Sequence, residues 1–111
     1  MNDIRQLIGE ATKYDKKQAL EVRKPKSWCK SVSAFANGIG GKLIWGIADD
    51  DTLVGLADAK SDAEKISEAI KTHLDPIPDF NLSFVKVEEK DLIVLDVMPG
   101  AQTPYYYIGD G

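Results

Sequence analysis

Basic side chains that could neutralise phosphate groups are concentrated in one stretch of this sequence. Residues 13 to 30 hold seven lysine and arginine residues and only two acidic ones, which gives this stretch a charge of +5. Because the whole chain carries −4, the remainder carries −9. A local cluster of this kind can attract a nucleic-acid backbone, although a chain with a pI of about 4.9 is not expected to coat nucleic acid over its whole surface. An ordinary solvated surface is an equally acceptable interpretation.

The candidate phosphate contacts are cationic side chains at the end of this stretch, joined by one further lysine: Arg23, Lys24, Lys26, Lys30 and Lys42. The same region contains four residues, 38 to 41, that we name the glycine corner, between a predicted helix and a predicted strand. Exposed backbone amides in such a corner could donate hydrogen bonds to phosphate, and the candidates there are Asn37, Gly38 and Gly41. The alternative is that the glycines only allow a sharp turn where side chains would clash.

Length and composition restrict the class of protein. At 111 residues the chain fits one domain, and its 43% hydrophobic and 29% charged residues are close to the globular average. No apolar run is long enough to span a membrane, and the first residues lack the features of a secretion signal. The single cysteine, Cys29, suits a reducing compartment and is expected in the core. These features predict a soluble cytoplasmic protein with no membrane partner.

Hydrophobic periodicity predicts the elements that must position these residues. Apolar residues at helical spacing predict two main helices, over residues 26–36 and 61–74, the second opened by a capping box at residues 61–64. A shorter amphipathic helix is predicted within residues 1–12. Alternation of apolar and charged residues predicts a strand at residues 19–23, and further strands are predicted at residues 43–47, 52–56, 82–87, 92–98 and from residue 104 onward. The predicted fold class is α+β (mixed α/β), with a single mixed sheet packed by two main helices.

Three tyrosines lie on the last of these strands. Because side chains alternate along a strand, Tyr105 and Tyr107 share one face and Tyr106 points to the other. At least one of the two faces is expected to be buried if the strand that would continue beyond this sequence is present.

The order of residues from the first main helix into the following strands resembles a known family. Residues 31–47 read SVSAFANGIGGKLIWGI, and they are followed by an acidic turn and by VGL at residues 54–56. The pattern resembles the Schlafen-type Alba-like domain, also called the divergent AAA domain, over roughly residues 18–108. This resemblance implies an Alba-like fold and DNA binding. We therefore expect residues 1–111 to form a single Alba-like domain excised from a longer protein.

The resemblance raises the possibility of ATP binding, which some members of the family have been described to do. A P-loop needs the pattern G-x-x-x-x-G-K-[ST] between a strand and a helix, so that backbone amides face the phosphates. Here Gly41 and Lys42 are followed by Leu43, and the predicted order is helix to strand. No Walker-type site is supported, and no cofactor is predicted.

A second enzymatic possibility comes from Schlafen relatives that cleave RNA with a few carboxylates. Carboxylates can hold metal ions that stabilise phosphodiester cleavage, and the corresponding residues here would be Glu21 and Asp49 or Asp50. The set is incomplete, because Lys16 stands where the nucleases carry another acid. We therefore predict no metal site and no catalytic activity.

The preferred interpretation is a nucleic-acid-binding domain of a transcriptional-regulator-like protein, with DNA as the ligand. The basic residues named above would hold backbone phosphates, and the sequence gives no sign of base-specific recognition. The alternative is a protein-interaction or oligomerisation module, which the acidic pI of the chain favours. A homo-oligomer is compatible with both interpretations.

Overall fold

A four-stranded mixed sheet lies at the centre of the protein, seen here as a computed structural model that describes residues 13–21 and 23–108. Its strands follow one another in the order β1 (Tyr14–Lys17), β2 (Gly41–Trp45), β5 (Lys90–Val97) and β4 (Phe80–Val87). β1 runs parallel to β2, and the other neighbours are antiparallel. Two short strands, β3 (Leu74–Asp75) and β6 (Tyr106–Tyr107), form a second antiparallel sheet. The predicted α+β class and the β4–β5 hairpin are confirmed, and the second small sheet is an addition.

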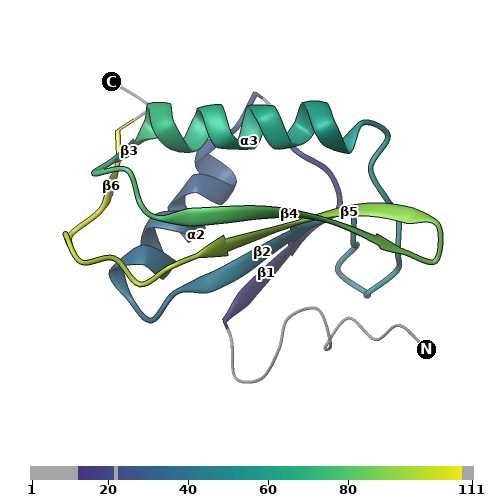
Figure 1. Cartoon of the computed structure of the whole chain (residues 1–111), viewed down its shortest axis with the longest axis horizontal. Coiled ribbons are helices and arrows are strands. Elements are labelled where there is room, and N and C mark those ends of the chain that lie inside the picture. Colours follow the sequence, from purple (N-terminus) through teal and green to yellow (C-terminus); the bar gives the residue numbers. More distant parts are fainter. Residues whose placement is uncertain (1–12, 22, 109–111) are drawn as a thin grey trace.

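Both helices cover the same face of the four-stranded sheet. The buried side chains of α2 (Lys26–Asn37) and α3 (Ala59–His73) share one core with β2 and β5, and in Figure 1 α3 runs above the strands while α2 passes behind them. The rings of Trp28 and Trp45 meet edge to face in this core, with centroids 5.4 Å apart. Cys29 is fully buried there, as expected, and burial raises the pKa of its thiol to about 12. Neither helix in the described ranges has the length and apolar character needed to cross a membrane.

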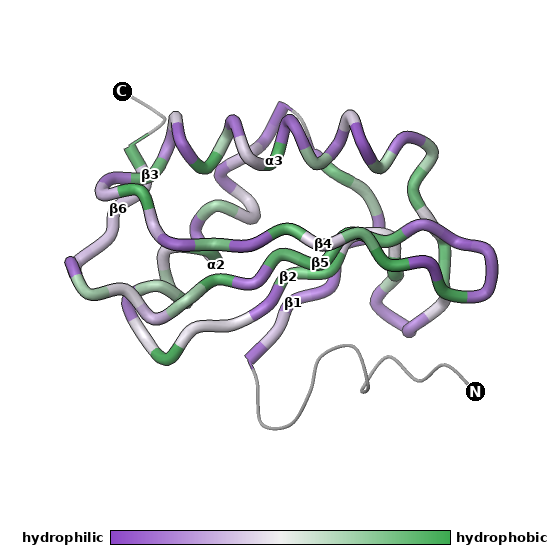
Figure 2. The backbone as a smooth tube through the Cα atoms, in the orientation of Figure 1, coloured by the Kyte–Doolittle hydropathy of each residue, from purple (hydrophilic) through white to green (hydrophobic). Residues whose placement is uncertain are grey.

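The two faces of β2 belong to different layers. Leu43 and Trp45 point toward the helices and join their core. Ile44 points to the other face, where a second, smaller apolar cluster is formed by Ile44, Ile47, Val87, Leu92 and Val94. Since side chains alternate along a strand, Lys42 lies on the face of Ile44, away from α2. In Figure 2, hydrophobic residues concentrate in the central strands, and β1 is largely hydrophilic.

The first strand lies earlier in the chain than the sequence predicted. Residues 19–23 alternate in polarity, but the strand is β1, which pairs with β2 along its whole length. The prediction was wrong because pairing with a neighbour decides where an outer strand forms, and charged residues are common on such strands. After β1, the amide of Lys24 donates to the carbonyl of Glu21 in a turn that leads into α2. The helix predicted within residues 1–12 lies outside the described residues.

Residues 52–56 form no regular strand. They meet the residues after β2 at one isolated bridge, between Ile47 and Leu53. Gly46 and Gly55 have φ angles of 106° and 81°, which turn the backbone out of strand geometry on both sides of the bridge. The two predicted strands are therefore replaced by β2, which begins and ends two residues earlier than predicted, and by an irregular return segment.

The second main helix begins earlier than its predicted capping box. Asp58 is the N-cap of α3, and its side-chain oxygen accepts a hydrogen bond from the amide of Ser61 at 3.1 Å. Ser61 is therefore a helical residue and not the cap. The prediction failed because both residues are of a type that caps helices, and only the backbone geometry distinguishes them.

Replacing Asp58 with alanine is expected to lower the free energy of unfolding by about 1 kcal/mol, because the cap hydrogen bond is lost. Urea denaturation followed by circular dichroism measures this change. Ser61→Ala is the matched control and is expected to stay within about 0.5 kcal/mol of the wild type. A greater loss from Ser61→Ala than from Asp58→Ala would contradict the assigned cap.

Candidate nucleic-acid interface

The structure separates the lysines that have acidic partners from the basic residues at the start of α2. Among the described residues, ion pairs with carboxylates include Lys16 with Asp51 (2.5 Å), Lys17 with Asp15 (3.3 Å), Lys42 with Asp96 (2.5 Å) and Lys86 with Asp91 (3.6 Å). In the part of the chain that the structure describes, no ion pair joins Arg23, Lys24 or Lys30 to an acidic side chain. These exposed cations are therefore available to an external anion.

We name Arg23, Lys24, Lys26 and Lys30 the basic segment. Residues 23–37 contain no acidic residue, and the acidic residue next to this stretch is Glu21, whose carboxylate accepts a hydrogen bond from the Ser27 hydroxyl. The lysines of α3 differ in this respect, since they lie among Asp62, Glu64 and Glu68 on the same helix. The start of α2 is thus a local concentration of positive charge on a protein with net negative charge.

One side of α2 borders an open groove. Lys26, Lys30 and Ser33 follow one another at helical spacing of four and three residues, which places them on a single face of the helix. Between this face and the segment around β6 lies an open groove with a volume of about 690 Å³, which we name the α2–β6 groove. Its lining residues are Lys26, Lys30, Ser33, Tyr105, Tyr106, Tyr107 and Ile108.

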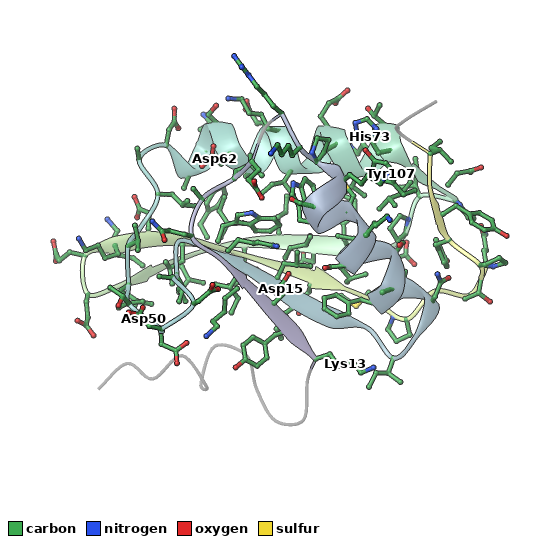
Figure 3. The ribbon with its side chains drawn as sticks, turned by 180° about the vertical axis from the view of Figure 1, so that it is seen from behind. Lys13, Asp15, Asp50, Asp62, His73 and Tyr107 are labelled. Atoms are coloured by element: carbon green, nitrogen blue, oxygen red, sulfur yellow. The ribbon has the colours of Figure 1, made fainter. Side chains whose placement is uncertain are left out.

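The three tyrosines of this groove differ in burial and in the contacts that their side chains make with the rest of the protein. Tyr105 is buried, and its hydroxyl accepts a hydrogen bond from the amide of Gln102 at 3.2 Å. Tyr107 stacks on His73 with ring centroids 5.5 Å apart, and the Nζ atom of Lys26 lies 5.9 Å from the centre of the Tyr107 ring. Figure 3 shows Tyr107 beside His73 at the end of α3. Tyr106, by contrast, is 58% exposed.

Asn37 has a structural task. Its Nδ2 atom donates to the carbonyl of Tyr105 at 3.1 Å, and its Oδ1 atom accepts from the amide of Tyr105 at 2.7 Å. Both ends of the side-chain amide are thus used to hold the last segment of the chain against α2. We therefore leave Asn37, which the sequence suggested as a phosphate contact, out of the interface.

The glycine corner is also explained by packing. The amides of Gly38 and Gly40 both donate to the carbonyl of Phe35, at 3.1 and 2.8 Å. A Cβ atom on Gly40 would lie 2.8 Å from the carbonyl oxygen of Val97, and one on Gly41 would lie 2.7 Å from the ring of Phe35. These contacts favour the steric alternative at Gly40 and Gly41, and the Gly38 amide is already bonded to Phe35. We therefore leave Gly38 and Gly41 out of the proposed interface.

Lys42 does not join the basic segment. It lies on the face of β2 that points away from α2, directly across from Asp96 on β5, with which it forms its ion pair. The expectation of a shared phosphate surface needs correction at this residue, because strand alternation separates Lys42 from the cations of α2.

Two of the candidate nuclease carboxylates meet at a different cleft. Glu21 and Asp49 help to line a cleft of about 400 Å³, which we name the β1 cleft and which also includes Lys16, Lys17, Gln18 and Ala19. The Glu21 carboxylate accepts a hydrogen bond from the hydroxyl of Ser27 at 3.0 Å. Within residues 13–21 and 23–108, no three metal-ligating side chains come together as a possible cation site.

Asp50 is not among the lining residues of the β1 cleft. Its carboxylate accepts a hydrogen bond from the amide of Thr52 at 3.0 Å, and hydrogen bonds from Thr52 lower the pKa of the Asp50 carboxyl. In Figure 3, Asp50 and Tyr107 lie toward opposite ends of the molecule. The turn after the central strand is therefore well separated from the α2–β6 groove.

The sequence did not identify Ser33 or the tyrosines as part of a site. The usable signal was the spacing of Lys26, Lys30 and Ser33, which puts two cations and a hydroxyl on one helical face. No local pattern indicates that residues 105–108 pack beside this face, because almost 70 positions separate the two segments.

Comparisons with known proteins agree with this architecture. The family model described as Schlafen, AlbA_2 matches residues 10–111, which is most of the chain. No curated protein sequence matches the chain. The fold is similar to the solution structure of the N-terminal domain of a protein from Nitrosomonas europaea named as related to the ATP-dependent DNA helicase RecG. That similarity has a TM-score of 0.69 and 24% identity, and covers 98% of this chain and 78% of the other.

A second similar structure is that of the DIP2311 protein from Corynebacterium diphtheriae. It has a TM-score of 0.61 and 19% identity, and the similarity covers 88% of this chain but only 22% of that larger chain. At these identities the two neighbours establish the fold alone.

Proposed function

The chain belongs to the Schlafen AlbA_2 family, and from this premise we propose that it binds nucleic acid, with DNA as the expected ligand. In this proposal the basic segment holds backbone phosphates by charge and by hydrogen bonds from its lysine and arginine side chains. Such contacts position a strand without reading its sequence. The domain would serve as the nucleic-acid-binding part of a transcriptional-regulator-like protein.

One observation carries this proposal. The cations of the basic segment are close in sequence, and in the described part of the chain Arg23, Lys24 and Lys30 form no ion pair, whereas four lysines of the sheet strands are paired with carboxylates: Lys16, Lys17, Lys42 and Lys86. An overall net charge of −4 would repel a polyanion, so binding depends on a surface where positive charge is both concentrated and unpaired. Among the described residues, Arg23, Lys24 and Lys30 of the basic segment meet both conditions.

The test compares two single lysine substitutions that change the net charge equally. Lys30→Ala is expected to weaken binding about threefold to tenfold, and to reduce the slope of log K against log salt by about 0.7 to 0.9, because one phosphate contact is lost. Lys42→Ala is expected to change neither quantity appreciably, since Lys42 is paired with Asp96 on the other face. Fluorescence anisotropy with labelled DNA and RNA oligonucleotides at several salt concentrations provides the measurement.

Equal weakening by both substitutions would mean that only net charge matters, and the proposed interface would be wrong. Absence of binding at low salt for every oligonucleotide would overturn the proposed function itself. If the protein binds RNA more tightly than DNA, the proposed interface would stand, and the expected ligand would be RNA instead of DNA.

Oligomerisation is a second candidate that one feature of the sheet favours. β4 is an outer strand of eight residues, and Phe84 at its middle is 61% exposed. Outer strands of this length with exposed apolar side chains can pair with another chain. A mass that rises with protein concentration in analytical ultracentrifugation, and that falls in Phe84→Lys, would support this candidate.

A further inference from the structure

The α2–β6 groove is lined by cations and by an exposed aromatic residue, Tyr106. Lys30 has no ion-pair partner among the described residues, and Tyr106 is 58% exposed. The two other tyrosines of the groove are already engaged, Tyr105 by burial and Tyr107 by stacking on His73. Tyr106 therefore presents a ring for which no partner is present in the described part of the chain.

We propose that this groove binds single-stranded nucleic acid, with one base stacked on Tyr106 and the neighbouring phosphates held by Lys26 and Lys30. This inference rests on the proposed function and names the form of nucleic acid that the interface prefers. A positively charged groove with an aromatic platform is the arrangement by which proteins hold unpaired strands, because every base offers a flat face to a ring.

The size and the chemistry of the groove fit this ligand. Its volume of about 690 Å³ lies within the size range of small-molecule binding sites. The hydroxyl of Ser33 donates to the carbonyl of Lys30 at 2.9 Å, so its lone pairs remain able to accept a hydrogen bond from a base amino group. Lys26, beside the Tyr107 ring, supplies a second cation at the wall of the groove.

A duplex cannot use this groove in the same way. Bases in a double helix are stacked on one another, so a protein ring reaches a base face only when the base is unpaired or displaced at an energetic cost. The phosphates of a duplex could still contact the basic segment. We therefore expect duplex binding to depend on the cations alone, and single-strand binding to depend on the cations and on Tyr106.

The experiment measures the affinity of the 111-residue chain for a single-stranded oligonucleotide and for the matched duplex. Tyr106→Ala is expected to weaken single-strand binding about tenfold or more and to leave duplex binding within a factor of about two. Tyr106→Phe keeps the ring and is expected to restore the affinity. Tyr14→Ala is the matched control, since Tyr14 is another exposed tyrosine, 45% accessible, on β1.

A direct readout of stacking accompanies the affinities. An oligonucleotide that carries the fluorescent base 2-aminopurine is expected to lose fluorescence when it binds the wild type and to keep it when it binds Tyr106→Ala. If Tyr106→Ala leaves single-strand affinity and quenching unchanged while Lys30→Ala still weakens binding, the stacking site is wrong and the phosphate interface stands. If the wild type binds neither the single strand nor the duplex, both proposals fall.

Discussion

Substituting alanine for Gly40 is expected to lower the free energy of unfolding by about 2 to 4 kcal/mol. Gly40 has a φ of 86°, which side-chain-bearing residues rarely adopt, and a Cβ atom there would lie 2.8 Å from the backbone carbonyl of Val97. Relief of both problems requires movement of the backbone where β2 and β5 begin to pair. Thermal or urea denaturation of the variant gives the measured loss.

The control for this prediction is a neighbouring glycine. Gly38 has a negative φ of −112°, and a Cβ atom there would lie 3.3 Å from the carbonyl oxygen of Ala34 and 3.9 Å from that of Phe35. Gly38→Ala is therefore expected to destabilise the protein less than Gly40→Ala does. A Gly40→Ala variant that is as stable as the wild type but fails to bind nucleic acid would reverse the steric assignment and return the glycine corner to the interface.

Removing all four cations of the basic segment is expected to weaken nucleic-acid binding on the order of a hundredfold at low salt. In the same variant, the slope of log K against log salt should fall by about 3 for a single strand, because four phosphate contacts are lost. The variant replaces Arg23, Lys24, Lys26 and Lys30 with alanine. Anisotropy titrations over a range of salt concentrations give both quantities.

A second fourfold variant keeps the same net charge and changes lysines that are already paired: Lys16, Lys17, Lys42 and Lys86 to alanine. It is expected to retain most of the affinity and the salt dependence of the wild type. Comparable losses in the two variants would show that the long-range charge of the protein, and not the start of α2, governs the interaction. Circular dichroism of both variants verifies that they fold.

The elements with strong local signals were predicted correctly from the sequence. The periodic stripe of α2 and the apolar runs of the β4–β5 hairpin are properties of neighbouring residues, and the structure has both. β1 was misplaced because its four residues, YDKK, carry no apolar pattern, and only their pairing with β2 makes them a strand. The start of α3 was missed because Asp58 and Ser61 offer equivalent capping chemistry.

The candidate site could be predicted only in part for a related reason. The cations of the basic segment are close in sequence, so their clustering could be predicted from the sequence alone. Lys42 was grouped with them because a continuous apolar strand does not indicate which of its polar neighbours faces which layer. The contribution of Tyr106 depends on packing between α2 and β6, a contact between distant segments that no local pattern predicts.

The most direct test of the central claim is the location of amide chemical-shift changes when a short single-stranded oligonucleotide is titrated into the ¹⁵N-labelled protein. The largest changes are expected on residues 23–33 and 105–108, which contain the basic segment and the α2–β6 groove. Largest changes at the β1 cleft, or around Lys42 and Asp96 on the other face of the sheet, would contradict this expectation, as would a spectrum that does not change at all.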